Sequence, residues 1–125
     1  MSDFGKLLTA VITPFDNNGV LNTDTLWRLC KKLVHEKSDG LVLSGTTGES
    51  PNLTKEDRKI IYSTAKYSVG DKAKIIAGTG TYSTKESIEY TKMANDIGVD
   101  GIMIVTPYYS KPSQFGILKH FEEIS

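Results

Sequence analysis

Hydrophobic positions along the chain form two alternating patterns, and the first is a set of short runs. Four runs are rich in valine, isoleucine and leucine and carry apolar residues on both alternating sets of positions: Leu7–Ile12, Leu41–Leu43, Lys74–Ala77 and Ile102–Val105. Strands of a parallel sheet covered on both faces have this character, because neither set of side chains faces water. The runs predict four buried parallel strands.

The second pattern is a stripe of apolar residues at helical spacing after each run, opened by a small polar residue. The first stripe is Leu26, Leu29, Leu33 and Val34 after Asn22 or Thr23, and the second is Ile61, Ala65 and Val69 after Thr54. The third is Ile88, Thr91, Ala94 and Ile97 after Ser83, and the fourth is Leu118, Phe121 and Ile124 after Ser113. Asp57 and Glu86, three residues after two of these caps, resemble capping boxes. The chain is predicted to alternate strand and helix four times without an internal domain boundary.

Two of the expected strands begin in the same way. Ser38-Asp39-Gly40 leads into one, and Val99-Asp100-Gly101 leads into the other. Successive strands start roughly 30 residues apart, which is the length of one βα unit. Right-handed crossovers then leave a doubly wound open sheet or part of a (βα)8 barrel. A whole barrel takes about 250 residues, so residues 1–125 would form half of one.

Composition excludes several classes of protein. The 125 residues are 38% apolar and 24% charged, as in globular domains, and 15 basic residues balance 15 acidic ones. This balance argues against binding to nucleic acid or to an anionic membrane. There is no apolar run of about 20 residues and no signal-peptide pattern at the start, so we expect a soluble, cytoplasmic protein. The single cysteine, Cys30, fits a small core residue.

The candidate chemistry lies where the expected strands end, since both architectures bind ligands at that edge. Four loops follow the strands: Thr13-Pro14, Gly45–Glu49, Gly78–Gly80 and Thr106–Tyr109. In Gly45–Glu49, two glycines let consecutive N–H groups point into one concavity, and two threonines add hydroxyls. These neutral donors suit a carboxylate better than a diphosphate, because no lysine follows as in a Walker loop. The alternative is a glycine turn whose threonines cap the next helix.

Other features predict less. Gly78-Thr79-Gly80 lacks the third glycine of a dinucleotide fingerprint. We expect His35 and His120 to be surface or helix-end residues, not metal ligands. Tyr108 and Tyr109 are adjacent phenols at a strand end, and we expect a functional role for at least one of them.

Four motifs carry a family resemblance: AVITPF at 10–15, GTTGES at 45–50, AGTG at 77–80 and TPYYSKPSQ at 106–114. Together they resemble the dihydrodipicolinate synthases, also called 4-hydroxy-tetrahydrodipicolinate synthases, over essentially the whole chain. The superfamily also contains N-acetylneuraminate lyases and keto-acid aldolases, which stay as alternatives. The pair Thr46-Thr47 and the segment 106–114 favour the synthases.

The resemblance implies an α/β fold, with residues 1–125 as one partial domain, the N-terminal (βα)4 half of a TIM (βα)8 barrel. It implies a lyase of lysine and diaminopimelate biosynthesis that joins pyruvate to aspartate 4-semialdehyde through a lysine Schiff base, without a metal or other cofactor. The iminium makes the pyruvate methyl group acidic enough to form an enamine nucleophile.

Site residues follow by matching motifs. Thr46 and Tyr109 match two members of a proton-relay triad, and Tyr109 matches a side chain that enters a neighbouring subunit, which implies a homo-oligomer. Thr47 matches the threonine that holds the pyruvate carboxylate. Neutral hydroxyl and phenol groups can pass a proton without burying a charge.

A second set of positions matches the family's allosteric lysine pocket. Ser50, Glu86 and Tyr108 agree with that pocket. Lysine-inhibited relatives carry histidine at the positions of Lys55 and Arg58 and asparagine at that of Tyr82; we therefore expect weak lysine binding or none.

The Schiff-base lysine has no counterpart in this chain. The family carries it on the sixth strand, and the third triad residue, a tyrosine, and a substrate-binding arginine follow the fifth. The lysines at other positions are not substitutes: Lys6, Lys72, Lys74 and Lys111. We therefore expect a truncated N-terminal half that is inactive alone. The alternatives are half of a split enzyme that needs its C-terminal half, and a non-catalytic carboxylate-binding module.

Overall fold

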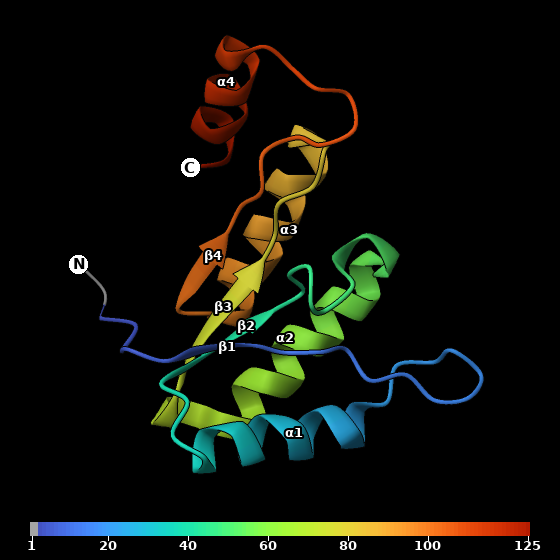
Figure 1. The fold of residues 1–125 in the computed structure, drawn as a ribbon, viewed down its shortest axis with the longest axis vertical. Coiled ribbons are helices and arrows are strands. Elements are labelled where there is room, and N and C mark those ends of the chain that lie inside the picture. The colour runs from blue at the N-terminus through green and yellow to red at the C-terminus, as the bar shows by residue number, and fades with distance from the viewer. Residues whose placement is uncertain (1–2) are drawn as a thin grey trace.

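The computed structural model describes residues 3–125 as an α/β fold in which parallel strands and helices alternate (Figure 1). The strands are β1 Leu8–Ala10, β2 Gly40–Leu43, β3 Lys74–Gly78 and β4 Gly101–Met103. The helices are α1 Thr23–His35, α2 Lys55–Val69, α3 Thr84–Ile97 and α4 Gln114–Ile124, with 3-10 turns η1 Ser50–Asn52 and η2 Gly70–Lys72. Within this part of the chain, no helix has the length and apolar character needed to cross a membrane.

The order of the strands distinguishes the two expected architectures. The sheet runs β1-β2-β3-β4, and every neighbouring pair is parallel, with Leu41 opposite Ile75 and Ala77 opposite Ile102. A doubly wound sheet reverses its order at a switch point, whereas a (βα)8 barrel adds strands in one direction. The helices pack in the same sequence, each against the next. The fold is therefore that of consecutive barrel units, as the sequence predicts.

The core lies between the sheet and the helices, most of it under α1 and α2. Leu41 and Ile75 on the central strands are fully buried and pack with Leu26 and Ile61. The expectation of burial on both faces is correct for β2 and β3 and wrong for β1 and β4. Leu8 is 41% exposed and Met103 is 43% exposed. These outer strands have a neighbour on one side only within residues 3–125, so their side chains stay in contact with water.

The helix starts follow the capping residues of the sequence. The Asn22 side chain accepts a hydrogen bond from the Thr25 N–H at 2.9 Å. Thr54 and Asp57 form a complete capping box at the start of α2, with each side chain accepting from the other residue's N–H. Ser83 and Ser113 cap α3 and α4 with one bond each, accepting from the Glu86 and Gly116 N–H groups. The capping box expected for Ser83 and Glu86 is wrong, because the Ser83 N–H donates to the Thr81 hydroxyl and not to Glu86. Local hydrogen bonding thus explains where these helices begin.

The buried faces of α3 and α4 differ from the expected stripes. The buried residues of α3 are Ser87, Tyr90 and Ala94, so only Ala94 of the expected stripe is fully enclosed. Leu118 on α4 is 53% exposed. His120 was expected at the surface or at a helix end, but it is buried and its Nδ1 lies 2.9 Å from Thr84 Oγ1. The packing of α4 on α3 therefore uses a polar contact that hydrophobic spacing does not reveal.

The two Asp-Gly steps have one structural role. The Asp39 carboxylate accepts hydrogen bonds from the Lys6 and Leu7 N–H groups at 2.7 and 2.8 Å, just before β1. These bonds lower the pKa of Asp39. Asp39, which lies just before β2, thereby fixes the start of the preceding strand, β1.

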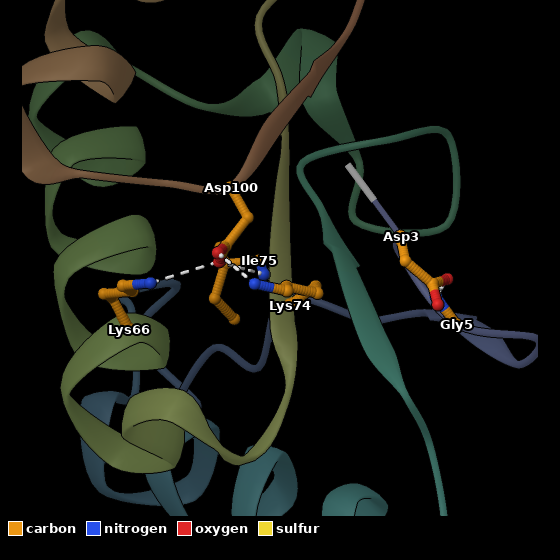
Figure 2. A network of polar contacts seen from close by, with 6 residues as sticks. All are labelled: Asp3, Gly5, Lys66, Lys74, Ile75 and Asp100. Carbon is orange, nitrogen blue, oxygen red and sulfur yellow. Dashed lines mark hydrogen bonds and ion pairs between the residues drawn. The ribbon is translucent and has the colours of Figure 1, made fainter. Parts of the chain in front are cut away.

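Asp100 repeats this contact at β3 (Figure 2). Its carboxylate accepts from the Ile75 N–H at 2.9 Å and lies 3.1 Å from the ammonium groups of Lys66 and Lys74. Burial raises the pKa of Asp100, but the N–H group and the two ammonium groups outweigh burial, so this pKa lies below its usual value. The ionised carboxylate joins α2, β3 and β4.

Replacing Asp100 with asparagine keeps an oxygen acceptor for Ile75 but removes the charge that attracts two ammonium groups. We expect the free energy of unfolding to fall by about 1 kcal/mol at neutral pH, since water screens partly exposed ion pairs. Because folding lowers the pKa of Asp100, this stabilisation is present above the unfolded pKa of about 3.9 and is lost as the pH falls through the lower folded pKa.

Urea unfolding of the wild type and of Asp100→Asn near neutral pH and at about pH 3 measures this difference. Asp96→Asn is the matched control, because Asp96 is exposed on α3 and makes no ion pair within residues 3–125. A difference between wild type and Asp100→Asn that stays constant with pH would contradict the role of the ionised carboxylate.

The exposed apolar side chains of the outer strands lead to a prediction about assembly. Leu8 and Ile102 lie on strands with one free hydrogen-bonding edge within residues 3–125, and Ile12 and Val105 are exposed beyond their ends. Such edges and apolar patches favour association. We expect the chain to self-associate at about 10 µM, as measured by sedimentation velocity. A single monomeric species with cooperative unfolding and no dye-accessible apolar surface would refute this expectation.

Candidate functional site

The loop after β2 is a tight turn with unusual backbone angles. The Ser50 N–H donates to the Gly45 carbonyl at 3.2 Å, and the Glu49 N–H donates to the Thr46 carbonyl at 3.1 Å. Ser44 and Glu49 both adopt the left-handed conformation, with φ of 53° and 57°. Residues other than glycine are uncommon there, and such conformations concentrate at functional sites.

The end of β1 holds this loop in place. The Thr13 hydroxyl, which is buried, donates to the Gly48 carbonyl at 2.7 Å. A Cβ atom at Gly48 would lie 3.1 Å from both the Ser44 nitrogen and the Val11 carbonyl oxygen. Glycine at position 48 therefore allows the loop to lie directly against the strand end.

The tip of the loop carries donors that the chain itself does not use. Within residues 3–125, the N–H groups of Thr46, Thr47 and Gly48 donate to no acceptor, and neither threonine hydroxyl has a hydrogen-bond partner. Both threonines are exposed. Five neutral donors on three consecutive residues can bind the two oxygens of a carboxylate. The threonines do not cap the next helix, which is capped by Thr54.

A cavity of about 470 Å³ lies at the carboxyl ends of β2, β3 and β4. Its walls come from the three strand ends, the loops that follow them and the turn η1: Ser44, Gly45, Thr46, Ser50, Pro51, Gly78, Gly80, Met103, Ile104, Val105 and Tyr108. The structure therefore brings Thr46, Ser50 and Tyr108 to one cavity. Thr47, Glu86 and Tyr109 do not line it.

The two tyrosines after β4 have different environments. Tyr108 is 37% exposed and packs edge to face on Tyr82, with ring centroids 5.5 Å apart. Tyr109 is 95% exposed and has a left-handed backbone, with φ of 70°. Packing within residues 3–125 does not explain the left-handed backbone of Tyr109, because its side chain is almost fully exposed. This geometry favours a role outside the chain's own core.

Residues that the family resemblance assigns to a lysine pocket are engaged in contacts of their own. Glu86 is exposed in the first turn of α3 and accepts from the Thr81 hydroxyl at 3.3 Å. Lys55 forms an ion pair with Glu89 at 3.3 Å. Arg58 turns inward, and its Nη2 donates to the Ser50 hydroxyl at 2.8 Å. The Ser50 hydroxyl therefore already has a hydrogen-bond partner in Arg58.

Sequence reasoning treated Arg58 only as a departure from a family motif and missed its burial. Arg58 is 2% exposed. A signal was present, because positions 58, 61, 62, 65 and 69 lie on one helix face, and the other four carry Ile61, Tyr62, Ala65 and Val69. An arginine on the apolar face of a helix indicates a buried polar contact.

Cys30 and His35 lie as the sequence predicts. Cys30 is fully buried in the core, and burial raises the pKa of its thiol to about 11, so the thiolate is scarce at neutral pH. His35 is exposed at the end of α1.

Comparisons with known proteins match nearly the whole chain. The model of the dihydrodipicolinate synthetase family matches residues 3–125. The 4-hydroxy-tetrahydrodipicolinate synthase of Desulforudis audaxviator is 50% identical over 123 residues, which are 98% of this chain and 42% of that relative.

Solved structures share the fold. A dihydrodipicolinate synthase from Bacillus anthracis is 44% identical with a TM-score of 0.95, over 99% of this chain and 42% of that one. The Acinetobacter baumannii enzyme, solved in complex with pyruvate, is 35% identical with a TM-score of 0.94, over 97% of this chain and 42% of that one. This chain spans less than half the length of these relatives, and its βα units match the N-terminal portion of their barrel. The chain belongs to the dihydrodipicolinate synthetase family.

Proposed function

We propose that this chain supplies one side of a 4-hydroxy-tetrahydrodipicolinate synthase site, at which pyruvate and aspartate 4-semialdehyde condense in lysine and diaminopimelate biosynthesis. The observation that carries the proposal is the set of free donors on Thr46, Thr47 and Gly48 at the end of β2. Pyruvate is a small carboxylate, and the Acinetobacter baumannii relative binds it. We propose residues 1–125 as one partial barrel domain that works in the cytoplasm.

In this proposal, the two threonines of the loop have different roles at the pyruvate end of the site. Thr47 and the neighbouring N–H groups hold the carboxylate and orient the keto carbon. The Thr46 hydroxyl, on the cavity wall, passes a proton to or from the reacting centre together with the Tyr109 phenol. Both groups are neutral, so the relay adds no charge to a site lined mainly by apolar atoms.

Tyr109 acts on a second subunit in this proposal. Its side chain is 95% exposed, and its strained backbone directs it away from the chain's own packing. A homo-oligomer would enclose this phenol beside another copy's Thr46. The imine-forming lysine would come from outside these residues, because no lysine lines the cavity in the part of the chain that is described.

A non-catalytic carboxylate-binding module is the second candidate, favoured by the same free donors and by the absence of a lysine from the described cavity wall. It differs in its response to a complementing half, which would add chemistry to a synthase but nothing to a binding module. N-acetylneuraminate lyases and keto-acid aldolases also use a keto-acid carboxylate, and product analysis distinguishes them.

Pyruvate with borohydride, followed by intact mass, tests the proposed chemistry. We expect no stoichiometric adduct on this chain alone, because an exposed lysine with a pKa of about 10.4 is almost fully protonated at neutral pH. Co-expression with the remaining portion of a relative's barrel should produce one adduct on that portion. Thr47→Val should then weaken pyruvate binding by about tenfold, or about 1.4 kcal/mol.

Thr25→Val is the control for the threonine variant, because Thr25 is exposed on α1, far along the chain from the loop. A single adduct that maps to one lysine of this chain alone would contradict the proposed division of the site. Pyruvate binding without any adduct in the reconstituted pair would favour the binding module.

Lysine binding gives an independent prediction. Arg58 places a positive charge directly against Ser50, and this charge repels the ammonium groups of free lysine. We expect calorimetry to detect no binding tighter than about 1 mM. The triple variant Lys55→His, Arg58→His and Tyr82→Asn should bind lysine more tightly than the wild type. A sub-millimolar affinity of the unaltered chain would refute the prediction.

A further inference from the structure

Arg58 is a buried cation without an acidic partner. Its side chain is 2% exposed, and it forms no ion pair with a carboxylate within residues 3–125. Buried charges are normally paired, because desolvation opposes the charged form. The charge here is balanced by carbonyl oxygens and by the face of Tyr90, whose ring centroid lies 4.6 Å from Arg58 Cζ.

The guanidinium joins two elements of the site. Nη1 donates to the Gly78 carbonyl at 2.7 Å, at the end of β3. Nη2 donates to the carbonyl and to the hydroxyl of Ser50, both at 2.8 Å. Ser50 in turn closes the loop by donating its N–H to Gly45. One side chain of α2 therefore fastens the loop with the free donors to the neighbouring strand.

Arginine suits this position better than lysine does. The planar guanidinium presents its donors in a fixed fork, so one group can reach Ser50 and Gly78 together, whereas an ammonium is a point charge. The fork is not fully used, because Nε has no acceptor within residues 3–125. An unused buried donor opposes folding, which argues that Arg58 serves more than stability.

The charge of Arg58 also reaches the cavity. Both of its partners, Ser50 and Gly78, line the cavity wall, so the guanidinium lies directly behind that wall. The residues that line the cavity include no ionisable acid or base other than the Tyr108 phenol. A fixed cation behind a neutral wall makes the cavity attract anions and repel cations.

We propose that Arg58 is the positioning residue of this site, which holds the Thr46–Thr47 loop in its carboxylate-binding conformation and makes the adjoining cavity selective for anions. The identity of the anion as pyruvate rests on the proposed function, whereas the fastening of the loop does not. Arg58 itself does not touch the ligand and acts through Ser50 and Gly78.

Amide hydrogen exchange in the 125-residue chain tests the fastening. In Arg58→Gln, the hydrogen-bonded amides of the loop, those of Glu49 and Ser50, should exchange at least about tenfold faster, while those of α1 keep their rates. Lys59→Gln is the matched control, because it removes one positive charge from the adjacent, exposed position of α2. Equal loop exchange in the two variants would overturn the proposal.

Pyruvate titration, followed by NMR, tests the selectivity. Arg58→Gln should weaken binding by about tenfold, and Arg58→Lys, which keeps the charge without the fork, should recover part of that loss. Equal losses in the two variants would overturn the selectivity for anions. If the wild type binds no pyruvate while Arg58→Gln still loosens the loop, the fastening stands and the proposed function fails.

The wild type supplies a test that needs no variant to fold. Arg28 and Arg58 are the two arginines of the chain, and Arg28 is exposed. The Arg58 guanidinium protons should exchange slowly and open together with the loop amides, while those of Arg28 exchange freely. Glu49 and Ser50 amides that open much faster than the Arg58 guanidinium would show that Arg58 does not hold the loop.

Discussion

The carboxyl ends of β2, β3 and β4 approach so closely that no side chain fits between their backbones, and the site depends on this approach. A Cβ atom at Gly78 would lie 2.3 Å from the Ser44 carbonyl oxygen, and one at Gly80 would lie 2.4 Å from the Val105 nitrogen. Distances this short exclude any residue larger than glycine without a shift of the backbone. The glycines therefore bring three strand ends together, and Gly78 and Gly80 line the cavity with backbone groups alone.

Such close packing leaves polar backbone groups that need partners, and α2 supplies them. The Gly78 carbonyl accepts from both Arg58 and the Tyr62 hydroxyl, at 2.7 and 2.9 Å. Burial raises the pKa of Tyr62, although the nearby guanidinium opposes this shift, so the phenol remains a donor. Ser44 Oγ, in contrast, is buried without a partner within residues 3–125. Ser44, just after β2, thus combines a left-handed backbone with a buried hydroxyl that has no partner in the described residues.

Sequence reasoning succeeds where the controlling interaction is local and fails where it is not. The cap residues Asn22 and Thr54 predict the starts of α1 and α2, because capping bonds span only three residues. The glycine-threonine turn follows from residue types in one short segment, whereas its carboxylate chemistry stays a prediction. The exposure of Leu8 depends on which strands adjoin β1, and the burial of His120 depends on a contact with Thr84, 36 residues away. The spacing of hydrophobic residues predicts neither the strands that adjoin β1 nor the contact of His120 with Thr84.

The amino-terminal and carboxyl-terminal ends of the strands therefore have different physical roles. At the starts of the strands, Asp39 and Asp100 satisfy backbone N–H groups with ionised carboxylates, and their pKa values are lowered because the folded state favours the charge. Beyond the ends of the strands, left-handed residues persist, which is unfavourable unless the surrounding structure compensates, and exposed N–H groups of the loop stay available to a ligand. The same division explains why the buried Arg58 lies at the carboxyl-terminal ends of the strands. An acidic partner there would compete with an anionic ligand for the guanidinium. Carbonyl oxygens balance the charge of Arg58 instead, so its positive field remains available to the cavity.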